Sequence, residues 1–287
     1  MKRKPIVILF AVILFLLALG MTLYPVISSY VNAKYASQIQ TAYEAVVLQT
    51  DNTALQEAKK QAKAYNDSIT PGASSSNAYS QEALLAASEN YDHMLDLAGN
   101  GIMGYVEIPK IDVYLPIYHG TEADTLDIGV GHLLGSSLPV GGDSTHSILT
   151  GHSGMASQKM FTDLEQVEQA DIFYLHVLDE VLSYQVDSIH TVLPHDTSHL
   201  GITRGEDYCT LVTCTPYGVN THRLLVRGTR IPYAEAEEQE EALELTEPES
   251  TSTWERQYIK GILIGVAAAI VLILILLLIR RSGHDGS

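Results

Sequence analysis

Basic residues and cysteines are scarce in this sequence of 287 residues. Lys and Arg total 17 against 34 Asp and Glu, and the formal net charge is -17 at pH 7. A nucleic-acid-binding protein needs a basic surface that displaces counterions, and the sequence contains no basic stripe for that purpose. Cys209 and Cys214 are the only cysteines, which argues against a disulfide-rich secreted scaffold. We therefore expect neither a nucleic-acid partner nor a disulfide framework.

Sequence motifs of metal and phosphate chemistry are also missing. There is no His-Glu-x-x-His helix and no Cys-x-x-Cys pair, the spacings that are typical of zinc sites. The glycine-rich stretches at residues 129–135 and 141–142 lack the Gly-Lys-Ser/Thr of a phosphate loop. We therefore expect neither a bound metal nor a phosphate-loop nucleotide site.

Two long segments contain no charged residue at all. Residues 6–26 follow a basic run at residues 2–4, and residues 261–279 end at two arginines, residues 280–281. Each segment has the length of about 20 residues that spans a bilayer, and basic flanks stay in the cytoplasm. We therefore expect both termini inside the cell and the intervening chain outside. The alternative for the first segment is a cleaved signal peptide, although its apolar run is long and no good small-residue cleavage site follows it.

Composition divides the chain into five regions. The run at residues 235–249 is acidic, has little apolar content and is expected to be solvated. We predict, in chain order, a membrane anchor at residues 1–27, a helical region at 28–98 with a breaker segment at 66–80, a β-rich domain at 99–233, an acidic linker at 234–257 and a transmembrane helix at 258–281.

Periodicity assigns the elements within these regions. Helical spacing of apolar residues predicts helices at residues 28–64 and 81–97, and short helical pieces fit residues 123–129 and 159–167. Val, Ile, Leu and Tyr, alternating in several places, predict strands at residues 105–111, 113–119, 147–151, 172–178, 182–192, 208–214 and 222–231. Many short strands at regular spacing predict a closed barrel or a sandwich.

Cys214 is the first candidate for chemistry. It ends an apolar strand, and the end of a strand holds a side chain rigidly while exposing it, which suits a nucleophile. The alternative is a buried cysteine that acts as a small apolar residue. A disulfide with Cys209 is not expected, because five residues of strand cover about 16 Å and the odd offset directs the two side chains to opposite faces. A disulfide needs Cα atoms within about 7 Å, so Cys214 is expected to be a free thiol.

A thiol needs a cation and a base to react. Arg223 opens the next strand, and a hairpin would bring it back beside Cys214, where a cation stabilises both the thiolate and a later oxyanion. Arg227, further along the same face, is a weaker alternative.

Histidine is the usual acid and base. His152 follows an apolar strand and has Gly151 and Gly154 beside it, which permit close approach of a backbone or substrate. His132, also in a glycine-rich stretch, is its main competitor, and His222 is expected to face away from Arg223. Spacing alone favours His152 only modestly.

These motifs resemble those of a known family. The segment TLVTC at residues 210–214, followed by Arg223, is similar to the sortase signature, and TGH at residues 150–152 is similar to the histidine motif of that family. Four longer stretches resemble class C, pilin-polymerising sortases: residues 104–111, 115–120, 131–142 and 214–228. The resemblance covers residues 99–232 closely.

The resemblance implies a mainly β fold, a sortase-type closed barrel of about eight strands with short helices, preceded by N-terminal helices and flanked by two transmembrane helices. It implies His152, Cys214 and Arg223 as catalytic residues, with Thr213, Thr215 and Tyr217 as candidate substrate contacts. It further implies cleavage of LPXTG-like sorting signals between Thr and Gly through a thioacyl intermediate, and transfer to a pilin lysine, so that isopeptide bonds join the subunits. No metal or organic cofactor is implied.

Other readings stay open. The acceptor could be a peptidoglycan amine or water, because the acceptor groove has no readable motif, and a non-catalytic membrane-anchored scaffold with a buried Cys214 is the third reading. Many class C sortases also carry a lid with an Asp-Pro-aromatic motif, which is missing here. Asp67 precedes Ser68 and Pro71 precedes Gly72, so the segment at residues 66–80 is either a lid without that motif or a plain linker.

Overall fold

The computed structural model describes residues 3–69, 90–155, 158–244 and 262–266. The chain divides into two compact units, of which the larger comprises Ser29–Pro248. This larger unit contains every strand and all the candidate catalytic residues.

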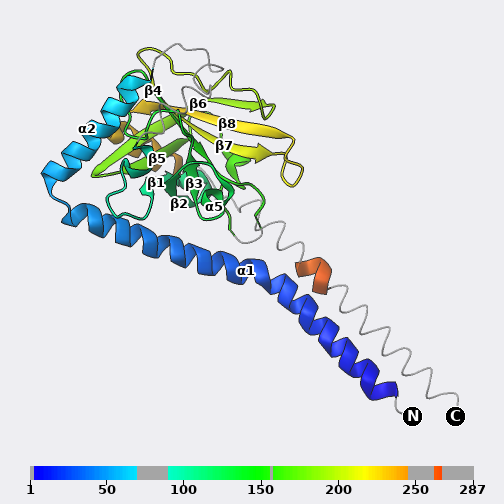
Figure 1. The fold of residues 1–287 in the computed structure, drawn as a ribbon. Coiled ribbons are helices and arrows are strands. Elements are labelled where there is room, and N and C mark those ends of the chain that lie inside the picture. The colour runs from blue at the N-terminus through cyan, green and yellow to red at the C-terminus, as the bar shows by residue number, and fades with distance from the viewer. Residues whose placement is uncertain (1–2, 70–89, 156–157, 245–261, 267–287) are drawn as a thin grey trace, which may run out of the picture. The chain divides into compact units, whose positions relative to one another are not determined.

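Eight strands close into a barrel (Figure 1) in the order β1-β2-β3-β4-β7-β8-β6-β5. This confirms the predicted mainly β fold, and closure leaves the sheet without an unpaired edge. The strands are β1 (Ile102–Ile108), β2 (Val113–His119), β3 (Val130–His132), β4 (Thr145–Thr150), β5 (Ile172–Val177), β6 (Glu180–Val192), β7 (Asp207–Thr215) and β8 (His222–Ile231).

Two of the strand pairs are parallel, and one of them positions the site. β4 pairs in parallel with β7, in a register that runs from Thr145 opposite Asp207 to Thr150 opposite Val212. Parallel neighbours end at the same edge of a sheet. The segments that follow β4 and β7 therefore leave the barrel side by side, although about 60 residues separate them in sequence.

Aromatic side chains fill much of the barrel interior. Phe173 and Tyr184 are fully buried and stacked, with ring centroids 5.5 Å apart. Gly228 lies against them, and a Cβ atom at this position would come within 2.6 Å of the Phe173 ring. A side chain at position 228 would therefore force the stacked pair apart.

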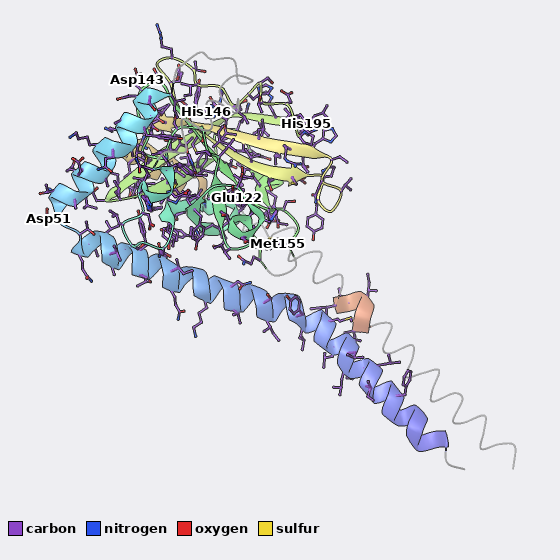
Figure 2. All side chains as sticks on the ribbon, in the orientation of Figure 1. Asp51, Glu122, Asp143, His146, Met155 and His195 are labelled. Atoms are coloured by element: carbon purple, nitrogen blue, oxygen red, sulfur yellow. The ribbon has the colours of Figure 1, made fainter. Side chains whose placement is uncertain are left out.

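The N-terminal region is two helices rather than one. Helix α1 (Arg3–Gln49) and helix α2 (Asn52–Ser68) are separated at Asp51, whose side chain accepts a hydrogen bond from Thr53 N at 2.7 Å and so caps α2. Figure 2 labels Asp51 at this junction. The expected helix at residues 28–64 is thus present, broken at Asp51 and extended to Ser68.

Helix α2 is fastened to the barrel by polar contacts. The buried Asn66 side chain donates to Leu138 O at 3.1 Å and accepts from Leu138 N at 2.7 Å. Lys59 forms an ion pair with Glu180 at the start of β6. The breaker segment predicted at residues 66–80 therefore begins only after the last turn of α2, and residues 70–80 lie outside the described residues.

One helical prediction needs correction, and two are confirmed. The helix expected at residues 81–97 is, in its described part, only one 3-10 turn, η1 (Tyr91–His93), because Asn90 and Leu95 adopt left-handed backbone angles. The short helical pieces expected at residues 123–129 and 159–167 are present. These are α5 (Ala123–Leu126) and η3 (Leu164–Gln166), while η2 (Pro109–Ile111) forms the turn between β1 and β2.

The acidic linker predicted at residues 234–257 begins as a helix. Helix α6 (Tyr233–Glu244) consists largely of Ala, Glu and Gln, which favour helix. It also joins a small core, because Ala236 is fully buried in a cluster with Ile172, Tyr174 and Ile231. The neighbouring residues 235, 237 and 238 are exposed, so this part of the run is solvated as expected except where Ala236 packs on the barrel.

Within the described part of the chain, no helix combines the length and the apolar character that a membrane crossing requires. Most of the C-terminal span predicted at residues 258–281 lies outside the described residues.

Candidate active site

Cys214 is the penultimate residue of β7. Its side chain is partly exposed, and the thiol is free. Cys209 on the same strand is also free but fully buried, and burial raises its pKa well above the usual range of a thiol. The sequence argument against a disulfide is confirmed, and Cys214 is the thiol that a substrate can reach.

Arg223 lies directly across the β7–β8 pair from Cys214. The antiparallel register places Cys214 opposite Arg223 and Thr215 opposite His222. Directly opposed residues share one face of a sheet, so the thiol and the guanidinium are on the same face and His222 is on the other. Arg223 Nη1 donates to His222 O at 3.1 Å, and none of the ion pairs of the described residues involves Arg223. Its charge is therefore available to a substrate.

His152 is placed by hydrogen bonds to the strand that carries Cys214. Gly151 N donates to Val212 O at 3.0 Å, and Thr213 Oγ1 donates to Gly151 O at 2.8 Å. The residue before His152 is thus bonded to both residues that precede Cys214. These contacts bring the His152 segment and the Cys214 strand end together.

The glycines around His152 are explained by close packing. A Cβ atom at Gly151 would lie 2.7 Å from the Phe161 ring, and Phe161 N donates to His152 O at 3.0 Å. Gly154 has a φ of 80°, and a Cβ atom there would lie 3.3 Å from the ring of Tyr217. The segment after Cys214 therefore packs against the segment after His152, so both segments lie at the end of the barrel that carries these two residues.

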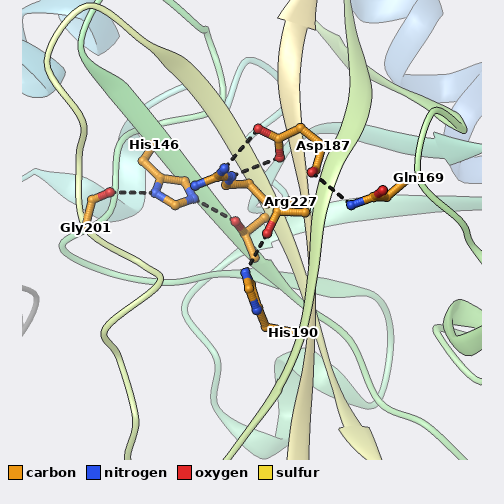
Figure 3. Close-up of polar contacts among 8 residues, drawn as sticks. His146, Gln169, Asp187, His190, Gly201 and Arg227 are labelled. Carbon is orange, nitrogen blue, oxygen red and sulfur yellow. Dashed lines mark hydrogen bonds and ion pairs between the residues drawn. The ribbon is translucent and has the colours of Figure 1, made fainter.

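The alternative arginine is already engaged. Arg227 donates to both carboxylate oxygens of Asp187, at 3.0 and 2.9 Å, and its guanidinium lies 4.2 Å from the centroid of the Tyr208 ring. Figure 3 shows this pair beside His146. A guanidinium fixed in this way stabilises the barrel wall and cannot also hold an oxyanion beside Cys214.

The alternative histidine is a core residue. His132 is fully buried, with Tyr91 Oη 2.9 Å from its Nδ1 and Ser137 O 2.9 Å from its Nε2. Burial lowers its pKa to about 4. His146, which lies 2.7 Å from Thr210 Oγ1 and 3.0 Å from Gly201 O (Figure 3), is likewise buried, and its pKa is also lowered to about 4. Neither imidazole is accessible to a substrate.

The three candidate substrate residues differ in exposure. Thr213 is 2% exposed and bonded to Gly151, and Thr215 is 8% exposed and donates to Glu165. Tyr217 is 46% exposed. Of the three, Tyr217 alone has a largely accessible side chain, whereas the threonines hold neighbouring segments in position.

Of the two possible lid residues, the structure describes one. Asp67 is exposed in the last turn of α2, and Pro71 lies outside the described residues.

In the described part of the chain, no group of three His, Cys, Asp or Glu side chains is arranged to hold a metal ion.

One neighbour of the site was not anticipated from the sequence. An Asp127 carboxylate oxygen lies 3.9 Å from His152 Nε2. Asp127 follows α5, within the short helical piece predicted at residues 123–129, but no motif singles it out as a site residue. Only the pairing of β3 with β4, Gly131 opposite Thr150, brings Asp127 to the histidine.

Comparison with known proteins agrees with this geometry. The sortase domain family matches residues 106–231. A solved structure of Streptococcus pneumoniae sortase C is 44% identical, with a TM-score of 0.61 and coverage of 68% of this chain and 97% of that chain. The chain belongs to the sortase family. Sortase C1 of Streptococcus agalactiae is also 44% identical, with a TM-score of 0.61, over 68% of this sortase and 98% of that chain.

More distant relatives match a smaller part of this sortase. Sortase D of Bacillus subtilis is 30% identical over 131 residues, which are 45% of this chain and 63% of the relative. Sortase A of Streptococcus agalactiae is 28% identical over 54% of this chain and 61% of the relative. The chain thus spans about three fifths of the length of these curated relatives.

Proposed function

We propose that this sortase is a cysteine transpeptidase that cleaves LPXTG-like sorting signals between Thr and Gly and joins pilin subunits through lysine isopeptide bonds. The observation that carries the proposal is the convergence of three segments at one end of the barrel. Cys214 lies opposite Arg223 in the β7–β8 register, and the residue before His152 is hydrogen-bonded to the two residues before Cys214.

The first half-reaction forms the thioacyl enzyme. The Cys214 thiolate attacks the carbonyl carbon of the substrate Thr, and the Arg223 guanidinium stabilises the oxyanion. The C–N bond to Gly then breaks, and the protonated imidazole of His152 gives its proton to the departing amine. The product is a thioester between Cys214 and the Thr carbonyl, with a neutral imidazole beside it.

The second half-reaction transfers the acyl group. An acceptor amine attacks the thioester, the C–S bond breaks, and His152 takes the proton from the nitrogen as Cys214 leaves as a thiolate. A pilin lysine is the proposed acceptor. This choice is supported by 40% identity to a pilus-related sortase C of Group B Streptococcus and by the pilin substrate specificity described for the Streptococcus pneumoniae sortase C.

Product masses test both halves of the proposal. The enzyme is incubated with a sorting peptide and with either a pilin or a peptidoglycan-type amine. The expected products are the released Gly fragment and a peptide–pilin conjugate, whereas a conjugate with the cell-wall amine alone would redirect the function to anchoring. Cys214→Ala is the control, and product formation by this variant would contradict the mechanism.

We further propose that the catalytic unit lies outside the cell membrane, with both termini in the cytoplasm. Support comes from the sequence, in which residues 6–26 and 261–279 are free of charge and the basic flanks lie on their outer ends. This arrangement would place the site where surface proteins with sorting signals are exported.

A further inference from the structure

Asp127 is an exposed carboxylate beside the proposed base. Its side chain is 62% exposed and that of His152 is 36% exposed. The Asp127 oxygen lies 3.9 Å from His152 Nε2, which is too far for a hydrogen bond. A carboxylate that orients a catalytic imidazole lies within about 2.6–3.2 Å of it. Asp127 is therefore close enough to act on whatever His152 deprotonates, without being bonded to His152 itself.

The position of Asp127 is fixed by its backbone. Asp127 N donates to Ala123 O at 2.9 Å, which closes the end of α5. On the other side, Gln158 Nε2 donates to Asp127 O at 3.1 Å, which ties the turn to the segment that follows His152. These two contacts fix the backbone of Asp127 beside His152, and its carboxylate is exposed to solvent or a ligand.

The ion pairs of the described residues include one for Asp127, and its partner is His152 rather than a lysine or arginine. A second carboxylate, Glu165, accepts a hydrogen bond from Thr215, the residue after Cys214. Thr215 and Cys214 are adjacent in β7 and face opposite sides of the sheet. The negative charge beside His152 that attracts a cation is therefore that of Asp127.

We propose that Asp127 binds the acceptor as an alkylammonium and delivers its nitrogen to His152. This inference rests on the proposed transpeptidase function and concerns only its second half-reaction. At neutral pH a primary alkylamine is almost entirely an ammonium, with three donors and no acceptor. A carboxylate at this distance from the base can take one donor while a second faces the imidazole. The ligand class is a primary ammonium, from a protein lysine or from a peptidoglycan peptide.

The proton balance of the step is simple. The bound ammonium first loses one proton to water and becomes a neutral amine. Its nitrogen then attacks the Thr carbonyl carbon, the C–N bond forms and the C–S bond to Cys214 breaks. His152 takes the second proton, and the sulfur leaves as a thiolate. Asp127 touches the acceptor only, so its removal should weaken acceptor use more than it affects thioester formation.

The test uses the full chain with Asp127→Asn, and Asp124→Asn as the matched control. Asp124 lies in α5, is exposed and has no ion pair with His152 among the described contacts. Three acceptors are compared: a lysine peptide of the pilin, a peptidoglycan stem peptide with a free amine, and hydroxylamine, which is uncharged at neutral pH. Acyl transfer is measured against acceptor concentration at low and high salt, together with the rate of thioacyl formation.

For Asp127→Asn we expect the half-saturating concentration of the ammonium acceptor to rise about five-fold at low salt and less at high salt. Hydroxylamine should be used equally well by the wild type and both variants, and Asp127→Glu should restore much of the ammonium preference. The peptide whose half-saturating concentration rises in Asp127→Asn identifies the source of the ammonium.

Two results would overturn the inference. One is an equal loss of acyl-transfer rate in Asp127→Asn with hydroxylamine and with the ammonium acceptors, or an equal loss in its rate of thioacyl formation. Either outcome would mean that Asp127 supports the imidazole rather than the acceptor. The other is identical behaviour of Asp127→Asn and Asp124→Asn. Failure of the wild type to form a thioacyl adduct on Cys214 is a separate result, which contradicts the transpeptidase proposal and the inference with it.

Discussion

At the scale of single residues, the two cysteines of β7 have opposite environments. Cys214 is partly exposed at the strand end, whereas Cys209, five positions earlier, is fully buried and its pKa is raised by burial. Reactivity requires access and the thiolate form. The difference between the two thiols should therefore be directly measurable.

We predict that an alkylating reagent modifies one thiol in the native protein and two after unfolding. Mass spectrometry of intact protein and of peptides should assign the native adduct to Cys214. The Cys214→Ser variant should take up no reagent until it unfolds. An unlabelled Cys214 in the native wild type would favour the non-catalytic scaffold instead.

The two arginines of β8 should separate activity from stability. Arg223→Ala is expected to lower the rate of thioacyl formation about 10²–10³-fold. It is expected to change the free energy of unfolding by less than about 0.5 kcal/mol, because the hydrogen bonds of its guanidinium within the described structure go to backbone oxygens. Arg227→Ala is expected to cost about 1–2 kcal/mol of stability through loss of the Asp187 pair and the Tyr208 contact. Steady-state kinetics and urea unfolding of both variants provide the measurement. Wild-type rates in Arg223→Ala would remove this residue from the mechanism.

The sequence identified part of the site and left part open for physical reasons. The hairpin offset was enough to predict Arg223 beside Cys214, because strand register is regular. Spacing favoured His152 over His132 only modestly, because the choice depends on burial, and His132 is buried by the distant Tyr91. Asp127 had no signal at all, because its relation to His152 is created by strand pairing and not by spacing.

At the scale of elements, β3 and β4 each hold a buried neutral histidine. His132 and His146 have pKa values lowered to about 4 by burial, against 6.5 in an exposed side chain. Protons therefore bind more readily to the unfolded chain, so each histidine contributes stability above pH 6.5 that is lost as the pH falls toward 4.

We predict that the free energy of unfolding decreases by up to about 1.4 kcal/mol per pH unit for each of these histidines between pH 6.5 and 4. Urea unfolding across this range measures the slope. His146→Gln keeps hydrogen-bonding groups but cannot titrate, so its slope should be smaller by about 1.4 kcal/mol per pH unit. An unchanged slope would show that His146 is not held neutral in the folded state.

Element prediction succeeded where a pattern was long and failed where it was short. The bounds of β2 and β8 coincide with the predicted strands at residues 113–119 and 222–231. β3 has three residues, too few for any period to be recognised. Helix α6 was missed because an acidic run without an apolar stripe suggests a solvated linker, whereas its attachment depends on one buried alanine, Ala236.

At the scale of the whole molecule, the proposed topology predicts a definite pattern of protease access. With the cell wall removed from intact cells, added protease should digest the barrel and spare a tag placed after Ser287. The tag should become accessible only when the cells are lysed.

N-terminal sequencing of the purified protein should find a terminus within the first residues, because the first apolar segment is expected to be retained. A tag cut in intact cells would contradict the C-terminal anchor. A new N-terminus after residue 26 would contradict the N-terminal anchor.

The strand order of the barrel also governs when catalysis can begin during synthesis. The last strand, β8, is inserted between β7 and β6 and carries Arg223. A nascent chain that ends soon after Cys214 has its sulfur but lacks both the guanidinium and the strand that closes the barrel. We therefore expect the proposed activity to begin only after β8 has been synthesised and has docked between β7 and β6.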